Sequence, residues 1–437
     1  AGADAAALLR ADAVLDPQIA PTGEPVDPVR VAAPAHLLLT GATGFLGAHL
    51  LARLLAVTGA RLHVLVDAEG PGEAERALDR ALRRFRLTVP RERVTVVPGS
   101  LREPLLGLSP MTFARLAATV DAIHHTGGDP DPALPYERLR PAVAGGTAEV
   151  LRLAARGRTK PVHHLSSPGV LAARDPGPGP GPGPEAERAP DHAHAPYAAA
   201  AALRPDGRVP AEAVPAAGPV RARWVAEELV EEGRRRGVPV SVYRAGRLGG
   251  ETGSGAVDPG SPFWRFLGAC TEVSAVPDLG AGTEFDLVPV DHAAAALAAL
   301  SLRTDASGGT YHLANPVRTR LGAVVDRLRA AGYPLVETDP GRWAGLVAAE
   351  ALDPGGDESA VPAALAEAAP GLPVLGGLRL DVSGTLAALD GTGVRCPAVE
   401  GPLLDRYVEH AVGAGLLAPP PDRAGRHTRD SRSENAV

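Results

Sequence analysis

Short apolar runs alternate with longer segments of helical period through the first 250 residues of the chain. The apolar runs are rich in leucine and β-branched residues and are bounded by Gly, Pro or Asp, as is typical of buried parallel strands. They lie at His36–Thr40, Leu62–Val66, Val94–Val97, Ala122–His125, Val162–Ser166 and Val240–Arg244. Helices are predicted between them at Ala48–Val57, Ala74–Phe85, Met111–Thr119, Gly146–Ala155 and Arg223–Arg236. Because strand and helix alternate, the pattern predicts an α/β fold, a Rossmann-like doubly wound parallel sheet.

The remaining segments lack this alternation and divide the chain into regions. Pro-Gly repeats and alanine runs without a period predict a flexible insertion at 172–217. The start, 1–30, is interpreted as a linker, and the polar end, 421–437, as a disordered tail. The expected domains are a Rossmann-like domain at 31–250 plus 282–315 and a smaller C-terminal substrate subdomain at 251–281 plus 316–420.

Composition narrows the class of protein. The chain has 437 residues, of which 45% are hydrophobic, so it can bury one large core or two ordinary ones. Its apolar stretches fall short of the roughly 20 residues that span a bilayer, and no signal peptide is recognised. A net charge of -7 offers no broad basic surface for nucleic acid, and Cys270 and Cys396 form neither a disulfide framework nor a zinc motif. We therefore expect a cytoplasmic enzyme with no membrane, nucleic-acid or metal partner.

A glycine-rich turn is the strongest local signal of chemistry. The stretch TGATGFLG at 40–47 follows the first predicted strand and opens a helix. In this context Gly41 permits a tight turn, Gly44 lets the backbone approach a pyrophosphate, and Gly47 lets the helix pack on the strand. The residues expected to contact a nucleotide, if one binds, are Gly41, Thr43, Gly44, Phe45, Leu46, Gly47 and Asp67.

Asp67 bears on which nucleotide would bind. It closes the second predicted strand, where a carboxylate can accept a hydrogen bond from an adenosine ribose hydroxyl and would repel a 2'-phosphate. This residue favours NAD over NADP. The alternative is that Asp67 is a solvated acid in a turn.

No tyrosine-lysine pair accompanies the glycine turn. A short-chain dehydrogenase uses Tyr-x-x-x-Lys to move a proton while its cofactor moves a hydride. Here the only lysine is Lys160, and no tyrosine, at positions 136, 197, 243, 311, 333 or 407, has a lysine four residues on. The scaffold therefore indicates an oxidoreductase, whereas the residues of the usual proton relay are missing.

Several stretches of sequence carry a family resemblance. They are TGATGFLGAHLL at 40–51, PLLGLS at 104–109, GGTAEVLRLA at 145–154, HLSS at 164–167, RWVAEELV at 223–230, YRAGRLGG at 243–250, VPVDHAA at 288–294 and CPAVEGPLLDRYV at 396–408. With them, the chain from Val31 to Leu417 resembles a terminal thioester reductase domain. This is the extended short-chain dehydrogenase module that ends many nonribosomal peptide synthetases and carboxylic acid reductases. The resemblance implies a carrier-protein partner that presents an acyl or peptidyl thioester on a phosphopantetheine arm.

Most of that family's working residues are replaced here. Ser167, preceded by Ser166, matches the hydroxyl that helps to bind the substrate carbonyl. The catalytic tyrosine falls on Pro219, which has no hydroxyl, and the lysine falls on Arg223, which keeps the charge but not the geometry. Three cofactor positions also differ: Asp67 replaces an arginine, Ser100 an aspartate and Val143 an asparagine. The resemblance with these changes disfavours hydride reduction by the usual mechanism.

Three functions stay open. The preferred one is a redox-independent release domain that offloads the thioester by Dieckmann-type cyclisation and requires no cofactor. In it Ser167 is an oxyanion donor, Arg223 a nearby cation, and His164 or His125 a base, with ordinary packing as the alternative for both histidines. The second function is a thioester reductase that uses NAD or NADP and another proton donor. The third is a catalytically silent docking domain.

Overall fold

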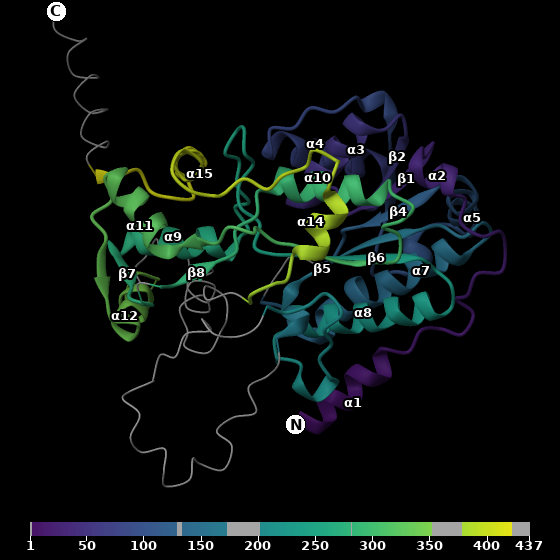
Figure 1. The fold of residues 1–437 in the computed structure, drawn as a ribbon, viewed down its shortest axis with the longest axis horizontal. Helices are drawn as coiled ribbons and strands as arrows, with labels where there is room; N and C mark the ends of the chain where they lie inside the picture. Colours follow the sequence, from purple (N-terminus) through teal and green to yellow (C-terminus); the bar gives the residue numbers. More distant parts are fainter. Residues whose placement is uncertain (1, 129–132, 173–201, 281, 352–377, 422–437) are drawn as a thin grey trace, which may run out of the picture.

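A seven-stranded parallel sheet forms the centre of the molecule (Figure 1). The computed structural model describes residues 2–128, 133–172, 202–280, 282–351 and 378–421. In spatial order the strands are β3 (Val94–Gly99), β2 (Arg61–Asp67), β1 (His36–Thr40), β4 (Ala122–His125), β5 (Val162–Ser166), β6 (Val240–Ala245) and β9 (Thr310–Leu313). Every neighbouring pair is parallel. The predicted Rossmann-like doubly wound sheet is confirmed, and all six predicted strands occur.

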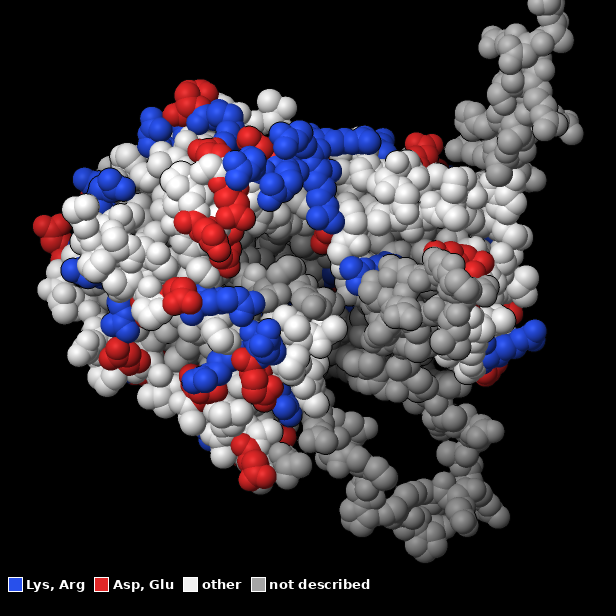
Figure 2. Space-filling model, turned by 180° about the vertical axis from the view of Figure 1, so that it is seen from behind, with Lys and Arg blue, Asp and Glu red and all other residues white. Residues whose placement is uncertain are grey.

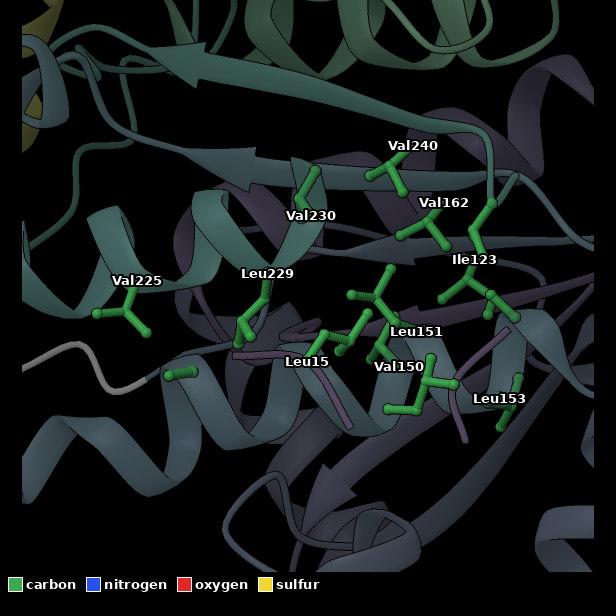
Figure 3. Close-up of a cluster of buried hydrophobic side chains, with 14 of the residues drawn as sticks. Leu15, Ile123, Val150, Leu151, Leu153, Val162, Val225, Leu229, Val230 and Val240 are labelled. Atoms are coloured by element: carbon green, nitrogen blue, oxygen red, sulfur yellow. The ribbon is translucent and has the colours of Figure 1, made fainter. Parts of the chain in front are cut away.

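One face of the sheet is covered by helices from the middle of the chain. They are α5 (Pro110–Thr119), α6 (Tyr136–Arg140), α7 (Gly146–Ala155) and α8 (Gly218–Arg235). Ser109 caps α5 by accepting a hydrogen bond from the backbone of Thr112. Apolar side chains of these helices meet those of the strands in one buried cluster (Figure 3). Burial of this apolar surface is the main stabilisation of this layer.

The opposite face is covered by α3 (Phe45–Val57), α4 (Pro71–Arg84), α10 (Val290–Ser301) and α14 (Ser383–Leu389) (Figure 1). Helix α10 packs along α3, and both are apolar on most sides because they lie between the sheet and the outer segments. The 3₁₀ turns η1 (Arg91–Arg93) and η2 (Pro104–Gly107) flank strand β3.

A second lobe has its own core. It contains α9 (Pro262–Glu272), α11 (Leu321–Ala330), α12 (Pro340–Ala351) and α15 (Pro402–Gly413), with the strand pairs β7 (Ala275–Pro277) to β11 (Val336–Thr338) and β8 (Glu284–Phe285) to β10 (Thr319–Arg320). Its core is rich in aromatic side chains, including Trp264, Trp343 and Tyr407. In Figure 1 this lobe lies beside the sheet, and the segment before α15 crosses back over the sheet domain.

The N-terminal segment is more ordered than the expected linker. It forms α1 (Gly2–Asp12) and α2 (Pro28–Ala32), and Leu9, Leu15 and Ile19 are buried in the same cluster as α7 and α8. Figure 3 shows Leu15 among the side chains of that cluster. The reason is the apolar spacing of this segment, which gives it a face to bury against α8.

The described part of the expected insertion, residues 202–217, also packs against the sheet domain. The 3₁₀ turn η4 (Pro168–Leu171) precedes it, the 3₁₀ turn η6 (Ala211–Ala213) lies within it, and Val214 is buried. Leu203 forms a bridge to Leu380, and the indole of Trp224 donates to the carbonyl of Val209. Residues 202–217 therefore pack on the sheet domain, whereas 173–201, with the Pro-Gly repeats, lie outside the described residues. Residues 422–437, most of the expected tail, also lie outside the described residues.

No helix in the described segments is long and apolar enough to cross a membrane.

Candidate functional site

The carboxyl ends of the parallel strands meet at one edge of the sheet, where doubly wound proteins bind their ligands. The glycine turn links β1 to α3 at this edge. Gly41 has a φ of +80°, and a Cβ there would lie 2.6 Å from the backbone nitrogen of Gly127, so only glycine fits. A Cβ on Gly47 would lie 2.0 Å from the carbonyl oxygen of Gly41, so the helix lies directly against the turn.

The start of α3 can receive an anion. Gly44 is its N-cap and is exposed together with Thr43, and as a glycine it offers no side chain to cap the helix. The side chains of Phe45 and Leu46 are buried, so these residues would reach a ligand through their backbone N–H groups. Free N–H groups at a helix start suit a pyrophosphate.

Asp67 and Ser100 meet at the ends of β2 and β3. Asp67 is exposed, and the Ser100 hydroxyl donates to its Oδ2 at 3.2 Å. This is the side of the sheet where an adenosine would lie in a Rossmann fold. With the glycine turn, these residues fit the adenosine and pyrophosphate of a dinucleotide. Val143 lies in the π-helical turn η3 (Pro141–Gly145) just before α7.

The two serines after β5 have different partners. The hydroxyl of Ser166 is buried and donates to Oε1 of Glu227 at 2.5 Å. Ser167 is the N-cap of η4, and its Oγ accepts from the backbone N–H of Gly169 at 3.3 Å. The Ser167 hydroxyl is half-buried, and among the described residues its one hydrogen bond is this local one, in which it accepts, so its proton can be donated to a ligand.

Helix α8 begins beside Ser167. A Cβ on Gly169 would lie 3.3 Å from Cγ2 of Val220, which places the first turn of α8 against the loop after β5. Pro219 is the second residue of this helix, where its missing N–H costs nothing. Arg223 follows one turn later on the same face. The position that resembles the catalytic tyrosine is therefore filled by a rigid ring without a hydroxyl.

Arg223 and His164 are electrostatic neighbours. Burial lowers the pKa of the Arg223 guanidinium, and within the described residues no hydrogen bond or ion pair holds its side chain. Burial, followed by the charges of Arg223 and Arg234, lowers the pKa of His164 to about 3. Both ring nitrogens of His164 are buried and have no hydrogen-bond partner in the described segments. At neutral pH His164 is an uncharged imidazole and a weak base.

The other histidines of β4 and β5 are built into the sheet. His125 lies against His164, with its Nδ1 2.8 Å from the hydroxyl of Thr40 and its Nε2 3.2 Å from that of Thr147. Burial and then the neighbouring His164 lower its pKa to about 3. On the opposite face His124 stacks on His163 with ring centroids 4.8 Å apart. The environment of His125 is that of a packed, hydrogen-bonded core residue. Over the described residues no group of three metal-ligating side chains gathers.

The remaining phenols and the lysine are engaged elsewhere. The hydroxyls of the described tyrosines, at 136, 243, 311, 333 and 407, each have a partner away from Ser167. Tyr197 lies outside the described residues. Lys160 donates to the carbonyls of Arg156 and Arg158 at the end of α7, which is a structural cap.

Sequence reasoning missed two charged residues of this site. Glu227 accepts from Arg244 through both oxygens, at 3.0 Å and 2.7 Å, and also from Ser166. Both side chains are largely buried, so the ion pair is held rigidly. Two signals could have found them: Glu227 is four residues after Arg223 on the same helix face, and Arg244 is a charge within a buried strand.

Comparison with known proteins agrees with this geometry. Residues 39–297 match the NAD-binding family model described as Male sterility protein. The terminal R domain of the myxalamid PKS-NRPS pathway is 33% identical, with a TM-score of 0.82 over 95% of this chain and 99% of that one. The reductase domain of a nonribosomal peptide synthetase from Mycobacterium tuberculosis is 26% identical, with a TM-score of 0.70 over 94% and 99% of the two chains.

One curated relative is the isonitrile lipopeptide synthase of Streptomyces coeruleorubidus, which is 35% identical over 432 residues. The match covers 95% of this chain and 27% of that protein. The chain thus spans about a quarter of the length of this relative.

Proposed function

The chain belongs to the terminal reductase domain family of nonribosomal peptide synthetases, and we propose that it releases a carrier-bound acyl or peptidyl thioester by cyclisation, without hydride transfer. The partner in this proposal is a carrier protein that presents the thioester on a phosphopantetheine arm. A nucleophile within the same acyl chain attacks the thioester carbonyl. The new bond to the carbonyl carbon forms first and gives a tetrahedral intermediate. The carbon-sulfur bond then breaks, and the proton lost by the nucleophile ends on the pantetheine thiol.

The observation that carries the proposal is Pro219 at the start of α8. It lies one helical turn before Arg223 and next to the loop of Ser167, where the family resemblance expects a phenol. A proline has no hydroxyl and cannot give a proton to a carbonyl reduced by hydride. Cyclisation needs no such donor because the tetrahedral intermediate collapses with loss of the thiol.

Ser167 and Arg223 supply the electrostatic part of the reaction. The Ser167 hydroxyl donates to the oxyanion that forms on the thioester carbonyl. Arg223 keeps its charge despite burial, since a guanidinium is not deprotonated in proteins, and it adds positive potential to the site. One well-placed donor of this kind contributes about 3 to 4 kcal/mol to acyl transfer.

His164 takes a modest role in this mechanism. Because its pKa is lowered to about 3, it is a poor acceptor of a full proton at neutral pH. The neutral imidazole can still donate one hydrogen bond to the bound substrate. The rate then depends mainly on proximity, since an intramolecular nucleophile has a high effective molarity.

A cofactor-dependent thioester reductase, giving an aldehyde or alcohol, is the second candidate function. The intact glycine turn, the open start of α3 and Asp67 favour it, because they fit a dinucleotide, and NAD more than NADP. A bound nicotinamide would supply hydride, and the chain would supply a proton donor other than residue 219. Tyr197 is the tyrosine to test, since the described phenols are engaged elsewhere.

The decisive experiment is the analysis of products from a carrier loaded with a β-ketoamide thioester. Mass spectrometry is run with and without NADH or NADPH. A ring formed in both samples supports the proposal, and an aldehyde or alcohol formed only with reduced nicotinamide supports the second candidate. Absence of turnover with either would favour a silent docking domain.

A further inference from the structure

A cavity lies on the protein away from the candidate site. It has a volume of about 770 Å³ and is bounded by α3, the turn after α4, the start of α10 and residues 393–397. This volume falls in the range of small-molecule sites, about 300 to 1,000 Å³. Neither Ser167, Arg223 nor the glycine turn lines it. It is therefore a separate place on the protein.

Three arginines from distant parts of the sequence line this cavity. They are Arg53 of α3, Arg86 after α4, and Arg395 before α15. All three are exposed, and among the described residues no hydrogen bond or ion pair engages their side chains. Figure 2 shows basic side chains gathered along the upper part of the face on which the molecule is hollowed. Guanidinium groups that line one cavity and have no carboxylate partner are suited to bind phosphate.

Arg86 is held in an unusual backbone conformation. Its φ is +56°, in the left-handed region that residues other than glycine rarely adopt. The backbone N–H of Leu87 bonds the carbonyl of Leu82 across this residue, so the conformation ends helix α4 in a tight turn. Here the conformation accompanies placement of the Arg86 side chain in the lining of the cavity.

The wall also carries a buried imidazole, His49, and a half-buried one, His292, each with one ring nitrogen that has no partner in the described residues. His49 is only 4% exposed, its Nδ1 bonds the carbonyl of Phe45, and its Nε2 has no partner in the described residues. Nδ1 of His292 is likewise buried and unpartnered there. Burial lowers the pKa of both residues, so they are neutral at physiological pH. A buried polar atom without a partner is costly, and a bound ligand that supplies one would remove that cost.

Two carboxylates complete the lining. Asp291 accepts from the backbone N–H and the hydroxyl of Thr252, and Glu251 accepts from the backbone of Gly253 and Ser254. These bonds fix both groups on the wall. Each carboxylate has further acceptor positions, which suit hydroxyl groups of a ligand.

We propose that this cavity binds a hydroxyl-bearing phosphate ester of nucleotide size or smaller. The phosphate lies among Arg53, Arg86 and Arg395, and the hydroxyls donate to Asp291 and Glu251. This site is independent of thioester release and of the glycine turn.

The test uses calorimetric titration of the full chain with ribose 5-phosphate, with ribose and with inorganic phosphate. Arg53→Gln and Arg395→Gln remove one guanidinium each at little change in size. Arg83→Gln is the matched control, because Arg83 is an exposed arginine at the end of α4 that does not line the cavity. Circular dichroism checks that each variant is folded.

Saturable binding of ribose 5-phosphate is expected, weakened at least tenfold by Arg53→Gln and by Arg395→Gln and unchanged by Arg83→Gln. Ribose should not bind, and inorganic phosphate should bind more weakly than the ester. The proposal is overturned by absence of saturable binding, by equal affinity in all variants, or by equal affinity for ribose or for inorganic phosphate.

Discussion

The paired histidines of β4 and β5 should make the fold sensitive to acid, and His124 offers the cleanest test. Both its ring nitrogens are buried without a partner in the described residues, and burial followed by the neighbouring His163 holds its pKa well below the ordinary value. The pKa values of His125, His163 and His164 are lowered to about 3, with burial as the main cause.

The direction of the pH effect follows from these pKa shifts. As the pH falls below about 6.5, the unfolded chain binds protons on these histidines while the folded chain does not, so stability is lost in that direction. One histidine of this kind costs about 1 kcal/mol between pH 6.5 and 5.5, and four cost about 4 kcal/mol. Since a typical domain has about 5 to 15 kcal/mol in total, we expect acid unfolding near pH 5.

His124→Leu should remove about a quarter of this loss. At pH 7.5 it should also stabilise the protein by about 1 kcal/mol, because an unpartnered polar group is replaced by an apolar one of similar size. His163→Leu is the matched comparison. It should flatten the pH dependence equally but bring no gain at pH 7.5, because it removes the buried hydrogen bond between His163 and the hydroxyl of Tyr243.

Urea unfolding of the wild type and both variants, followed by circular dichroism at pH 7.5, 6.5 and 5.5, measures these changes. A His124→Leu variant that is less stable at pH 7.5 and keeps the full acid dependence would refute the reasoning. It would mean that His124 is partnered or charged in the folded protein.

Three further predictions concern the candidate site. Ser167→Ala should lower thioester release about 100- to 1,000-fold with little change in thermal stability, because it removes one oxyanion donor; an unchanged rate would exclude that role. The double variant Pro219→Tyr with Arg223→Lys should gain reduction that consumes nicotinamide, measured by absorbance at the cofactor's band, whereas continued inactivity would show that other replacements also block it. Glu227→Gln should lower the free energy of unfolding in urea by about 3 kcal/mol, because the buried guanidinium of Arg244 then has no carboxylate partner in Glu227. A decrease well below 1 kcal/mol would contradict the rigid ion pair.

Much of the sheet could be predicted from the sequence because its central strands are largely buried. The runs at His36–Thr40 and Val162–Ser166 are apolar enough to be recognised and occur with the predicted bounds. Strand β9, Thr310–Leu313, was missed because it is short and contains polar residues, although its His312 is fully buried. The packing of α1 was missed as well, since its apolar spacing does not reveal that its partner, α8, lies about 200 residues further along the chain.

In the candidate site, too, local features could be predicted from the sequence, whereas contacts between distant residues could not. The glycine turn is encoded locally, because the close contacts of Gly41 and Gly47 arise within one strand-turn-helix unit. The network of Ser166, Glu227 and Arg244 depends on three elements that meet only in the folded sheet. The low basicity of His164 is likewise set by burial and by Arg223 across the chain. From the sequence alone, these residues could be assigned to strands and helices, but the residues that they contact could not be identified.

The identity of the product tests the central claim most directly. A carrier loaded with a β-ketoamide thioester is incubated with the full chain in the absence and presence of NADH and NADPH, and the released compounds are analysed by mass spectrometry. The proposed mechanism predicts the same cyclic product at the same rate in all samples. An aldehyde or alcohol that appears only when reduced nicotinamide is added, with matching consumption of the cofactor, would contradict it.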